Sequence, residues 1–368
     1  MSTKKDKFSS KEKNYMRLAL DLARARKGLT GDNPSVGCVI VKKNQIISIG
    51  QTGYNGRPHA ETNAINNAFQ RISGSEMYVS LEPCNHYGKT SPCTNRIIKS
   101  GINKVYYCID DIDQKVKGKS FKILKDKNIH VKRGILKKNA IDLYNSYKVN
   151  RKNKLPYVIG KIAISKNKLI YSKGTKRITD KYSDKLTHYL RYKNDAIMIS
   201  SKTLNIDNPK LNCRLKGLEN FSPRRIILDK LLTIKLNSYI IKSSKKENTI
   251  IFHNSTNFLK IKSLKKRGLY LIKLSFDKKG HFDLKKILKR LFKLGIRNLL
   301  VEGGDNLTKK FLEKRLFNEF YLFRSPKILS KSNKHQFFTS QGILNTTYNR
   351  KFKFSSKLAK DNITIYKR

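Results

Sequence analysis

Hydrophobic residues recur at two different spacings, and the spacing changes several times along the chain. Tyr15, Leu18 and Leu22 recur at helical spacing, and they follow Ser9-Ser-Lys-Glu12, which matches the capping-box pattern of a helix start. Short runs rich in Val, Ile and Tyr then alternate with further helical segments. This alternation predicts a layered α/β protein.

The predicted elements fall into two groups along the chain. Strands are predicted at 36–41, 45–49, 77–81, 104–109, 129–132, 157–165, 196–200, 225–228, 249–252, 270–274 and 298–302, and helices at 60–69, 94–100, 121–127, 179–193, 284–294 and 307–313. The polar stretch 150–156 separates the groups and is closed by a proline. Since 368 residues suit about two domains, we expect α/β domains at 1–152 and 153–368.

The chain is strongly basic, with 81 Lys+Arg against 26 Asp+Glu and a net charge of +55. The charge is spread along the whole chain, and Trp is absent, which favours compositional drift in an AT-rich genome over a selected nucleic-acid surface. We therefore expect nucleic acid to bind only non-specifically, through charge.

No apolar run approaches the roughly 18 residues of a membrane span, and no secretory signal is visible. Five scattered cysteines fit a reducing cytoplasm.

Three short motifs place zinc-binding side chains in order along the first half. They are His59-Ala-Glu61 at a predicted helix start, Glu82-Pro-Cys84 after a predicted strand, and Pro92-Cys93 before a predicted helix. One imidazole and two thiolates hold Zn²⁺ and leave a fourth position open for water, as in catalytic sites. Zinc lowers the pKa of such a water toward about 7, and Glu61 can carry the proton. Because prolines suit helix first turns, we expect both thiolates at positive helix ends.

The spacing of the two cysteines narrows the class of deaminase. Eight residues separate Cys84 from Cys93, whereas nucleic-acid and nucleoside deaminases commonly carry Pro-Cys-x-x-Cys. The stretch from Leu81 to Cys93, with Asn33-Pro-Ser-Val-Gly37 upstream, resembles the signature of the bifunctional deaminase-reductases of riboflavin biosynthesis. The resemblance implies a cytidine-deaminase-like three-layer α/β/α domain. It also implies that three side chains line the pyrimidine pocket: His86, Lys89 and Thr90.

The second half carries motifs similar to those of the same family's reductase, in the same order. They are Lys161-Ile-Ala-Ile-Ser165, Leu190-Arg191, Thr203-Leu-Asn-Ile-Asp207-Asn-Pro-Lys-Leu211-Asn-Cys-Arg214 and Val301-Glu302-Gly-Gly304. A Gly-Gly turn before a helix lets backbone N–H groups approach a pyrophosphate. The resemblance runs from about Tyr15 to Tyr366 and implies a C-terminal α/β domain like dihydrofolate reductase.

This resemblance also implies two sets of contacts in the reductase half. The residues implied to contact the substrate are Thr175, Arg191, Leu211, Arg214 and Glu302. The residues implied to contact NADPH are Ala163, Arg177, Thr203, Asp207 and Gly304. Gly304 begins a loop of implied cofactor contacts that extends to Lys310. Arginine forks suit the phosphate of the substrate, because they pair bidentately with its oxygens.

The implied activity is a bifunctional hydrolase and oxidoreductase. The first domain would deaminate 2,5-diamino-6-(5-phosphoribosylamino)pyrimidin-4(3H)-one with one zinc per chain, and the second would reduce its ribosyl group to ribityl with NADPH. Arginines in both halves would recognise the shared phosphate. We expect a cytoplasmic enzyme with a small-molecule substrate, no membrane partner and a homodimer formed through the reductase domain.

Three departures from the family pattern stand out. The segment at Ser165-Lys-Asn167-Lys168 is two residues shorter than usual, Arg177 stands where an aromatic is expected, and Asp111-Ile-Asp113-Gln replaces Asp-Pro-Asn-Pro. We expect the first two to alter nicotinamide packing and reductase efficiency. Two other functions compete with the main one: a tRNA- or nucleic-acid-editing deaminase, favoured by charge, and a binding protein whose catalytic centres have decayed.

Overall fold

The structure is a computed structural model that describes residues 7–173, 177–245, 248–331, 335–354 and 360–368. Its contacts divide the chain into two compact units, Met1–Lys154 and Leu155–Arg368. Each unit is an α/β structure with its own sheet and its own apolar core. The predicted fold class is therefore confirmed.

The first unit has one sheet and six α-helices in its described residues. The strands are β1 (Gly37–Lys42), β2 (Gln45–Gln51), β3 (Glu76–Val79), β4 (Lys104–Tyr107) and β5 (His130–Arg133), and the α-helices are α1 (Ser10–Arg26), α2 (Ala60–Asn66), α3 (Cys93–Lys99), α4 (Lys119–Lys125), α5 (Lys137–Leu143) and α6 (Asn145–Asn153). The capping box predicted for α1 is present, because the Glu12 N–H donates to Ser9 Oγ at 3.2 Å and the Ser9 N–H donates to the Glu12 carboxylate at 2.6 Å.

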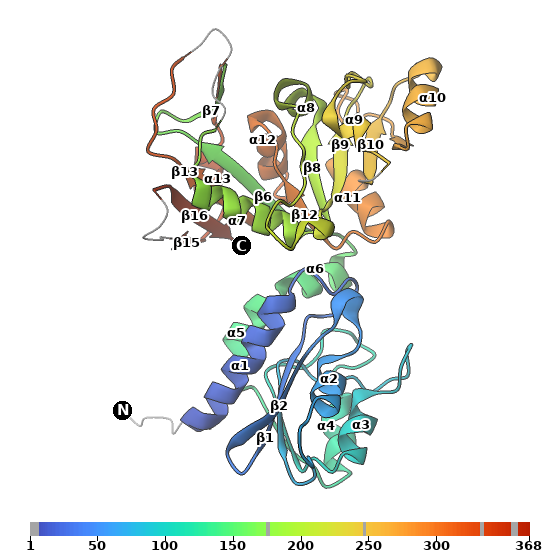
Figure 1. The fold of residues 1–368 in the computed structure, drawn as a ribbon, viewed down its shortest axis with the longest axis vertical. Coiled ribbons are helices and arrows are strands. Elements are labelled where there is room, and N and C mark those ends of the chain that lie inside the picture. The colour runs from blue at the N-terminus through green and yellow to red at the C-terminus, as the bar shows by residue number, and fades with distance from the viewer. Residues whose placement is uncertain (1–6, 174–176, 246–247, 332–334, 355–359) are drawn as a thin grey trace. The chain divides into compact units, whose positions relative to one another are not determined.

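Helices cover both faces of this sheet, whose strand order is β2-β1-β3-β4-β5. β1 pairs antiparallel with β2 and β3, and β3, β4 and β5 run parallel. Figure 1 shows α1 and α5 on one face and α2, α3 and α4 on the other. The result is the three-layer α/β/α arrangement expected of the first domain, and it places the starts of α2 and α3 on the same face of the sheet.

Gly50 on β2 lets α2 lie unusually close to the sheet. A Cβ at this position would lie 2.2 Å from the Ala60 carbonyl oxygen and 2.4 Å from the Ala64 backbone nitrogen. Both contacts are to backbone atoms of α2, so a side-chain rotation cannot relieve them. The absence of a side chain at Gly50 therefore fixes the height of α2, which carries Glu61, above the sheet.

We expect Gly50→Ala to displace α2 and to lower deaminase activity. Overpacking of this kind costs about 1–3 kcal/mol of stability, and a helix shift would misplace Glu61. Thermal unfolding and ammonia release measure the two effects, and reduction by the second unit serves as the internal control. Full deaminase activity in Gly50→Ala would show that α2 tolerates the displacement.

The second unit has a larger sheet with helices on both faces. The strands are β6 (Tyr157–Ile164), β7 (Leu169–Ser172), β8 (Ala196–Ser200), β9 (Arg224–Leu228), β10 (Thr249–His253), β11 (Tyr270–Lys273), β12 (Asn298–Val301), β13 (Glu319–Arg324), β14 (His335–Phe337), β15 (Arg350–Phe354) and β16 (Asn362–Lys367), and the helices are α7 (Lys181–Tyr192), α8 (Ser201–Asp207), α9 (Tyr239–Lys242), α10 (Phe258–Lys266), α11 (Leu284–Lys293), α12 (Asp305–Glu313) and α13 (Gln341–Thr347).

The main sheet of this unit has the order β11-β10-β9-β8-β12-β6-β13-β16-β15. Its strands from β11 to β13 run parallel, whereas β16 is antiparallel to both β13 and β15. Strands that are buried on both faces explain the nearly continuous apolar runs at 196–199 and 249–252. Open α/β sheets bind ligands at the carboxyl ends of such parallel strands.

Several elements differ from the pattern-based prediction. The stretch at 150–156, interpreted as a polar linker, begins inside α6, which ends at Asn153. β13, β15 and β16 were not predicted from the sequence pattern. β15 alternates Lys with Phe, and all five of its residues are exposed, so it lacks the buried face on which a strand prediction depends.

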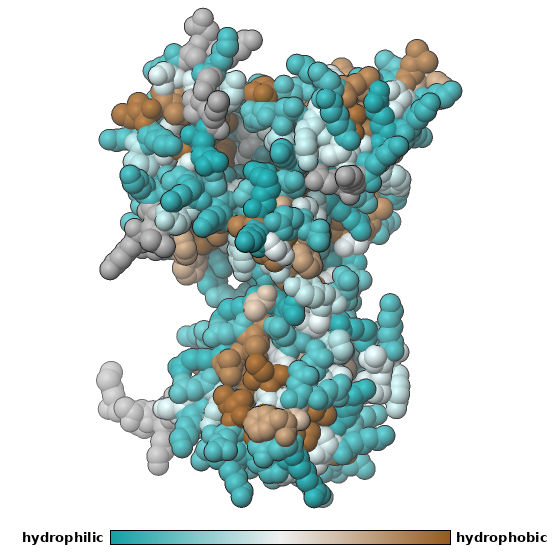
Figure 2. Space-filling model, viewed as in Figure 1, coloured by the Kyte–Doolittle hydropathy of each residue, from teal (hydrophilic) through white to brown (hydrophobic). Residues whose placement is uncertain are grey.

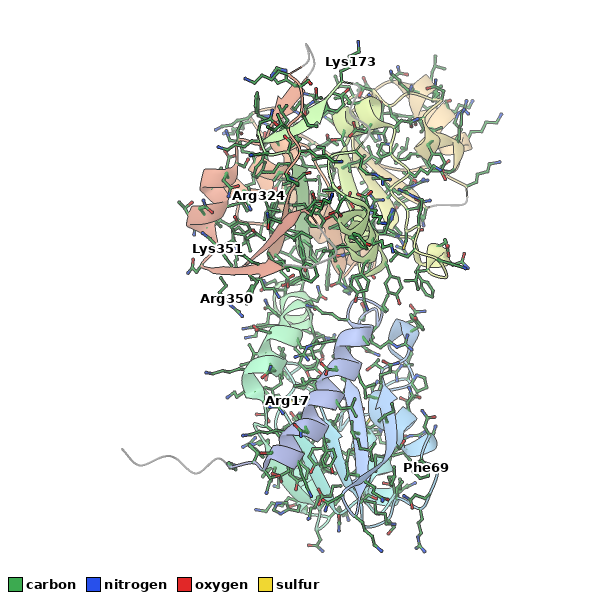
Figure 3. All side chains as sticks on the ribbon, turned by 60° about the vertical axis from the view of Figure 1, so that its left-hand side comes forward. Arg17, Phe69, Lys173, Arg324, Arg350 and Lys351 are labelled. Carbon is green, nitrogen blue, oxygen red and sulfur yellow. The ribbon has the colours of Figure 1, made fainter. Side chains whose placement is uncertain are left out.

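The charge of the chain is distributed over both units. Figure 2 shows hydrophilic residues over most of the visible face of each unit. Arg17 lies on the first unit, and Lys173, Arg350 and Lys351 lie on the second (Figure 3). This distribution agrees with the spread of Lys and Arg along the sequence.

Candidate active sites

The first unit brings together the three side chains predicted to hold zinc. His59 is the N-cap residue of α2, Cys93 is the first residue of α3, and Cys84 lies in the loop that follows β3. Their ligand atoms all lie within 4.8 Å of one another. His59 Nδ1 is 3.3 Å from Cys93 Sγ and 3.5 Å from Cys84 Sγ.

The helix-end prediction is right for one cysteine and wrong for the other. Pro92 is the N-cap of α3, so Cys93 does begin a helix. Cys84 belongs to no helix, because Pro83 is followed by an extended loop. Its thiol is nevertheless coupled to the helix start, because the Cys93 backbone N–H donates to Cys84 Sγ at 3.3 Å. A proline before a cysteine suits a loop as well as a first turn, which explains the error.

The chemistry of these groups fits a zinc ion. An imidazole and two thiols form an N/S donor set of the kind that holds Zn²⁺ with one position free. Hydrogen bonds with the Cys93 thiol and with His59, together with the Cys93 amide, lower the pKa of Cys84 to about 4 against the effect of burial. This favours a thiolate, the form of cysteine that binds metals.

Glu61 lies beside the cluster on the first turn of α2. Its side chain is buried, with 4 % exposure. Burial raises the pKa of Glu61 to about 7, and the nearby His59 only partly opposes this. A carboxyl group that can take up and release a proton near neutral pH is suited to general acid–base chemistry.

A small pocket borders the cluster at His59 and Cys84, and a buried carboxylate fixes one of its walls. The Glu82 carboxylate accepts hydrogen bonds from the backbone N–H groups of Asp111 and Gly118, both at 2.9 Å, and of Ser120 at 3.1 Å. Asp111, Asp113 and Val116 line the pocket. Glu82 therefore joins the wall at 111–118 to the segment that carries Cys84, a role that the sequence motif did not reveal.

Of the three residues expected around the pyrimidine, His86 and Thr90 line this pocket. Thr90 Oγ1 accepts a hydrogen bond of 2.6 Å from Arg57. Lys89 is exposed and lies outside the lining. The contact between Lys89 and the pyrimidine stays a prediction.

Asp111 should make the stability of the first unit depend on pH. Burial raises the pKa of Asp111 to about 6, partly opposed by the Asp113 backbone N–H. Because this folded-state value lies above the ordinary 3.8, the protonated carboxyl favours folding, and that contribution is lost as the pH rises through about 6. Asp111→Asn keeps an acceptor for Asp113 and cannot ionise, so we expect it to be more stable than the wild type by about 2 kcal/mol at pH 8.

Chemical denaturation across pH 4.5 to 8 measures this difference, which should shrink toward the acid end. Asp110→Asn is the matched control, since Asp110 is a more exposed neighbour paired with Arg133 at 3.3 Å. A difference that stays constant with pH would mean that the effect comes from packing and not from ionisation.

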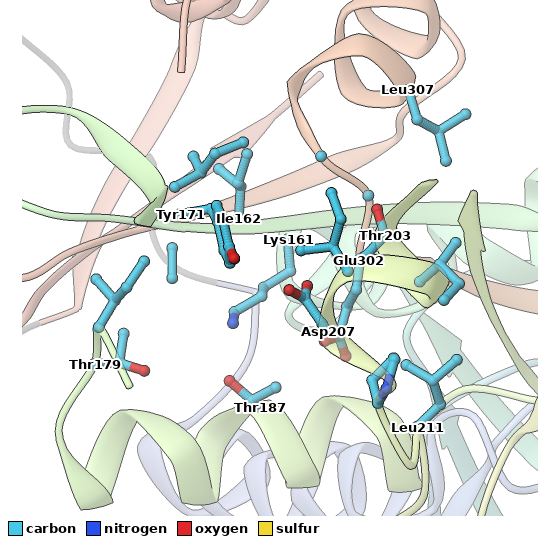
Figure 4. A pocket seen from close by; sticks show the side chains of 18 of the residues that line it. Lys161, Ile162, Tyr171, Thr179, Thr187, Thr203, Asp207, Leu211, Glu302 and Leu307 are labelled. Atoms are coloured by element: carbon cyan, nitrogen blue, oxygen red, sulfur yellow. The ribbon is translucent and has the colours of Figure 1, made fainter. Parts of the chain in front are cut away.

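The second unit contains a cavity of about 1110 Å³ at the carboxyl ends of its parallel strands. Figure 4 shows α7 along one side of this cavity and the start of α12 on the other. Gly303 and Gly304 form the turn between β12 and α12, and a Cβ on Gly304 would have no atom nearer than 3.7 Å. The N-terminus of α12 thus offers open backbone N–H groups to an anion such as a pyrophosphate.

An ion pair lies in the lining of this cavity. Arg191 Nε and Nη2 donate to the two Glu302 carboxylate oxygens at 2.8 and 2.9 Å, and the side chains are 11 % and 13 % exposed. Burial raises the pKa of Glu302, but the charge and hydrogen bonds of Arg191 outweigh this and lower it. Lys161 on β6 points into the same cavity, and burial lowers its pKa.

The cavity gathers nearly all the residues that the sequence predicted for the reductase site. Those that line it are Ala163, Arg177, Arg191, Thr203, Asp207, Leu211, Arg214, Glu302 and Gly304. Thr175 lies outside the described residues. Arg177 pairs with Asp184 at 2.9 Å and is 61 % exposed, so the residue found in place of an aromatic lies at the cavity with its charge partly in solvent.

Among the lining residues that the sequence analysis did not assign to the site are two titratable side chains, Lys161 and His188. Lys161 was noted only as the start of a strand motif, and His188 was not considered. Burial, together with Arg191 and Arg214, lowers the pKa of His188 to about 4, so it lies in the cavity as a neutral ring. Its spacing of three residues from Arg191 on α7 was the signal that could have found it.

Comparison with known proteins agrees with this division. Residues 9–109 match the family model described as the cytidine and deoxycytidylate deaminase zinc-binding region, and residues 156–364 match the RibD C-terminal domain. The riboflavin biosynthesis protein RibD of Aquifex aeolicus is 36 % identical over 87 % of this chain and 88 % of its own length. The RibD protein of Bacillus amyloliquefaciens is 33 % identical over 86 % of this chain and 85 % of its own.

A solved structure shows the same likeness across both units. The diaminohydroxyphosphoribosylaminopyrimidine deaminase/5-amino-6-(5-phosphoribosylamino)uracil reductase of Thermotoga maritima matches with a TM-score of 0.80 and 28 % identity, covering 97 % of this chain and 99 % of that one. Within the described residues, no helix is long and apolar enough to cross a membrane.

The fold and the two sites thus define a two-domain enzyme that joins a zinc-type deaminase to a reductase. The chain belongs to the RibD family of riboflavin biosynthesis proteins. It is a deaminase and a reductase of that pathway, with a pyrimidine substrate, a zinc site and a cofactor of the NADPH type. The nucleic-acid-editing alternative is not favoured by these relatives.

Proposed function

We propose that the chain deaminates 2,5-diamino-6-(5-phosphoribosylamino)pyrimidin-4(3H)-one and then reduces the ribosyl group of the product to ribityl with NADPH. The observation that carries this is the presence of two complete sets of groups in one chain: a His/Cys/Cys cluster beside a buried carboxyl, and a large cavity with an Arg–Glu pair. We assign deamination to residues 1–152 and reduction to residues 153–368.

In the deaminase, His59, Cys84 and Cys93 would hold one zinc ion per chain. The zinc ion would act as a Lewis acid that activates water. Glu61, 4 % exposed beside the cluster, would take up a proton from the attacking water molecule and deliver it to the departing amino group, which leaves as ammonia. The pocket wall fixed by Glu82 would hold the pyrimidine against the cluster. His86 and Thr90 lie in the same lining and would contact the ring.

In the reductase, NADPH supplies the hydride. The turn at Gly303 and Gly304 would bind its pyrophosphate, and Ala163, Thr203, Asp207 and Arg177 would line the rest of the cofactor site. Arg191, Arg214, Leu211, Glu302 and Thr175 would hold the phosphorylated sugar. Arg191 is already oriented by two hydrogen bonds from its guanidinium to Glu302, so little side-chain entropy is lost when substrate binds.

Ammonia release and NADPH oxidation, followed together with the phosphoribosylated diaminopyrimidinone, test this function. We expect both reactions, with NADPH oxidation following deamination. Ammonia without NADPH oxidation would contradict the reductase assignment and point to Asn167, Lys168 and Arg177. Zinc-loaded protein that does neither would contradict the substrate assignment.

We also propose that the chain forms a homodimer through the reductase domain. The exposed strand β15 at the end of the large sheet carries Phe352 and Phe354, which are 44 % and 48 % exposed, on one face. Size-exclusion chromatography with light scattering measures the molar mass of the protein in solution. The molar mass of a monomer at micromolar concentration would contradict the proposal. The cytoplasmic location expected from the sequence stays a prediction.

A further inference from the structure

The deaminase pocket must accommodate a negatively charged substrate although its walls carry several carboxyl groups. Those groups are Glu61, Glu82, Asp111 and Asp113. The proposed substrate ends in a phosphate, which needs a cation to replace its water shell. Among the described residues that line this pocket, the two arginines are Arg57 and Arg151.

The two arginines occupy different parts of the pocket. Arg57 is two residues before His59 in the chain and donates to Thr90 Oγ1 at 2.6 Å, so it belongs to the end where the metal would bind. Arg151 is on α6, where it lies 3.8 Å from Asp113 and donates from Nη2 to the Asp32 carbonyl at 3.3 Å. The amine-bearing carbon of the substrate must face the metal, so the phosphate, at the far end of the ribose, must lie toward the other end.

Arg151 is held in place but retains capacity to bind an anion. The ring of Tyr147, one turn earlier on α6, lies 5.2 Å from its guanidinium, and Tyr147 Oη lies 3.3 Å from Asp111 Oδ1, to which it donates. Within the part of the chain that the structure describes, Arg151 Nε has no hydrogen-bond partner, because the 3.8 Å to Asp113 is an ion pair too long for one. The planar fork of a guanidinium matches phosphate oxygens, and Nε can serve as a further donor once the guanidinium turns away from Asp113.

We propose that Arg151 recognises the 5′-phosphate of the ribose in the deaminase site and thereby selects phosphorylated substrate. The proposal rests on the deaminase function proposed above. Asp113 orients the guanidinium, and the 3.8 Å ion pair can lengthen further when a dianion approaches the fork. The preference for a phosphorylated pyrimidine is then set in the first domain, before the arginines of the reductase act.

The test compares two substrates in the wild type and in variants of Arg151, Arg133 and Arg57. The substrates are the phosphoribosylated diaminopyrimidinone and the same compound without its phosphate, and the readout is kcat/KM for ammonia release. Arg151→Gln should lower kcat/KM for the phosphorylated compound by about 10- to 100-fold, the range of a charge-assisted hydrogen bond. It should leave the dephosphorylated compound within about twofold, because the lost interaction is with the phosphate alone.

Arg133→Gln is the matched control, since Arg133 pairs with Asp110 at 3.3 Å in the same unit but lies outside the pocket. Zinc content and NADPH oxidation by the reductase check that each variant is folded. Arg151→Lys keeps the charge but not the fork, so it should recover part of the preference. Ribose 5-phosphate should inhibit ammonia release from the phosphorylated substrate in the wild type. In Arg151→Gln this inhibition should weaken by the same factor as kcat/KM.

Three results would overturn the inference. Equal losses for the two substrates would show that Arg151 only supports the fold of the pocket. An unchanged preference in Arg151→Gln, or a preference that disappears in Arg57→Gln instead, would place the phosphate elsewhere. If the wild type releases ammonia from neither compound, the proposed deaminase function fails, whatever Arg151 does.

Discussion

Replacing Glu61 by Gln is expected to lower ammonia release by about 10²–10⁴-fold while the protein still binds zinc. Glu61 is 4 % exposed, sits one residue into α2 and lies beside the ligand cluster without belonging to it. Glutamine has nearly the same shape but cannot exchange a proton. The reaction therefore loses its proton carrier and keeps its metal ligands.

Zinc analysis, ammonia release and NADPH oxidation on the same Glu61→Gln preparation check this. Reduction of the deaminated intermediate should stay at the wild-type rate, because the reductase cavity is formed by the second unit. Cys93→Ser provides the contrast, since it should lose zinc as well as activity. Undiminished ammonia release from Glu61→Gln would remove Glu61 from the mechanism.

Replacing Arg191 by Met is expected to destabilise the second unit by about 3–5 kcal/mol and to abolish most reductase activity. The substitution leaves the Glu302 carboxylate in a site where it is only 13 % exposed and has lost its bidentate partner. The charge of Lys161 still opposes burial, but without Arg191 the pKa of Glu302 rises from its lowered value. A group whose folded-state pKa is raised favours folding at low pH, so the variant should recover part of its stability as the medium becomes acidic.

Denaturation at pH 5 and pH 8, with NADPH oxidation on the deaminated intermediate, measures these effects. Arg224→Met is the control, because Arg224 is an exposed arginine of the same sheet that donates to the Leu294 carbonyl. Ammonia release should be unchanged in both variants. A stability loss in Arg191→Met that does not vary with pH would argue against an uncompensated carboxylate at Glu302.

The zinc cluster could be predicted because its signals are local. His59 and Cys93 each sit at the start of a helix, and the order of the three motifs along the chain was sufficient to group them. The surroundings of the cluster were not predictable in the same way. Glu82 accepts hydrogen bonds from backbone N–H groups that lie 29 to 38 residues later in the chain. The parallel pairing of β3 with β4 decides which loop lies next to Glu82.

Local sequence patterns were enough to predict the alternation of strands and helices, the first helix with its capping box, and the three side chains that form the candidate zinc cluster. These follow from periodicity, backbone preferences and donor chemistry, which act over a few residues. Tertiary structure alone decided that Arg191 meets Glu302, 111 residues later. It also decided that Arg151 on α6 lines the deaminase pocket, and that Cys84 lies in a loop. The reason is that burial and sheet pairing select such contacts among many that the local pattern allows equally.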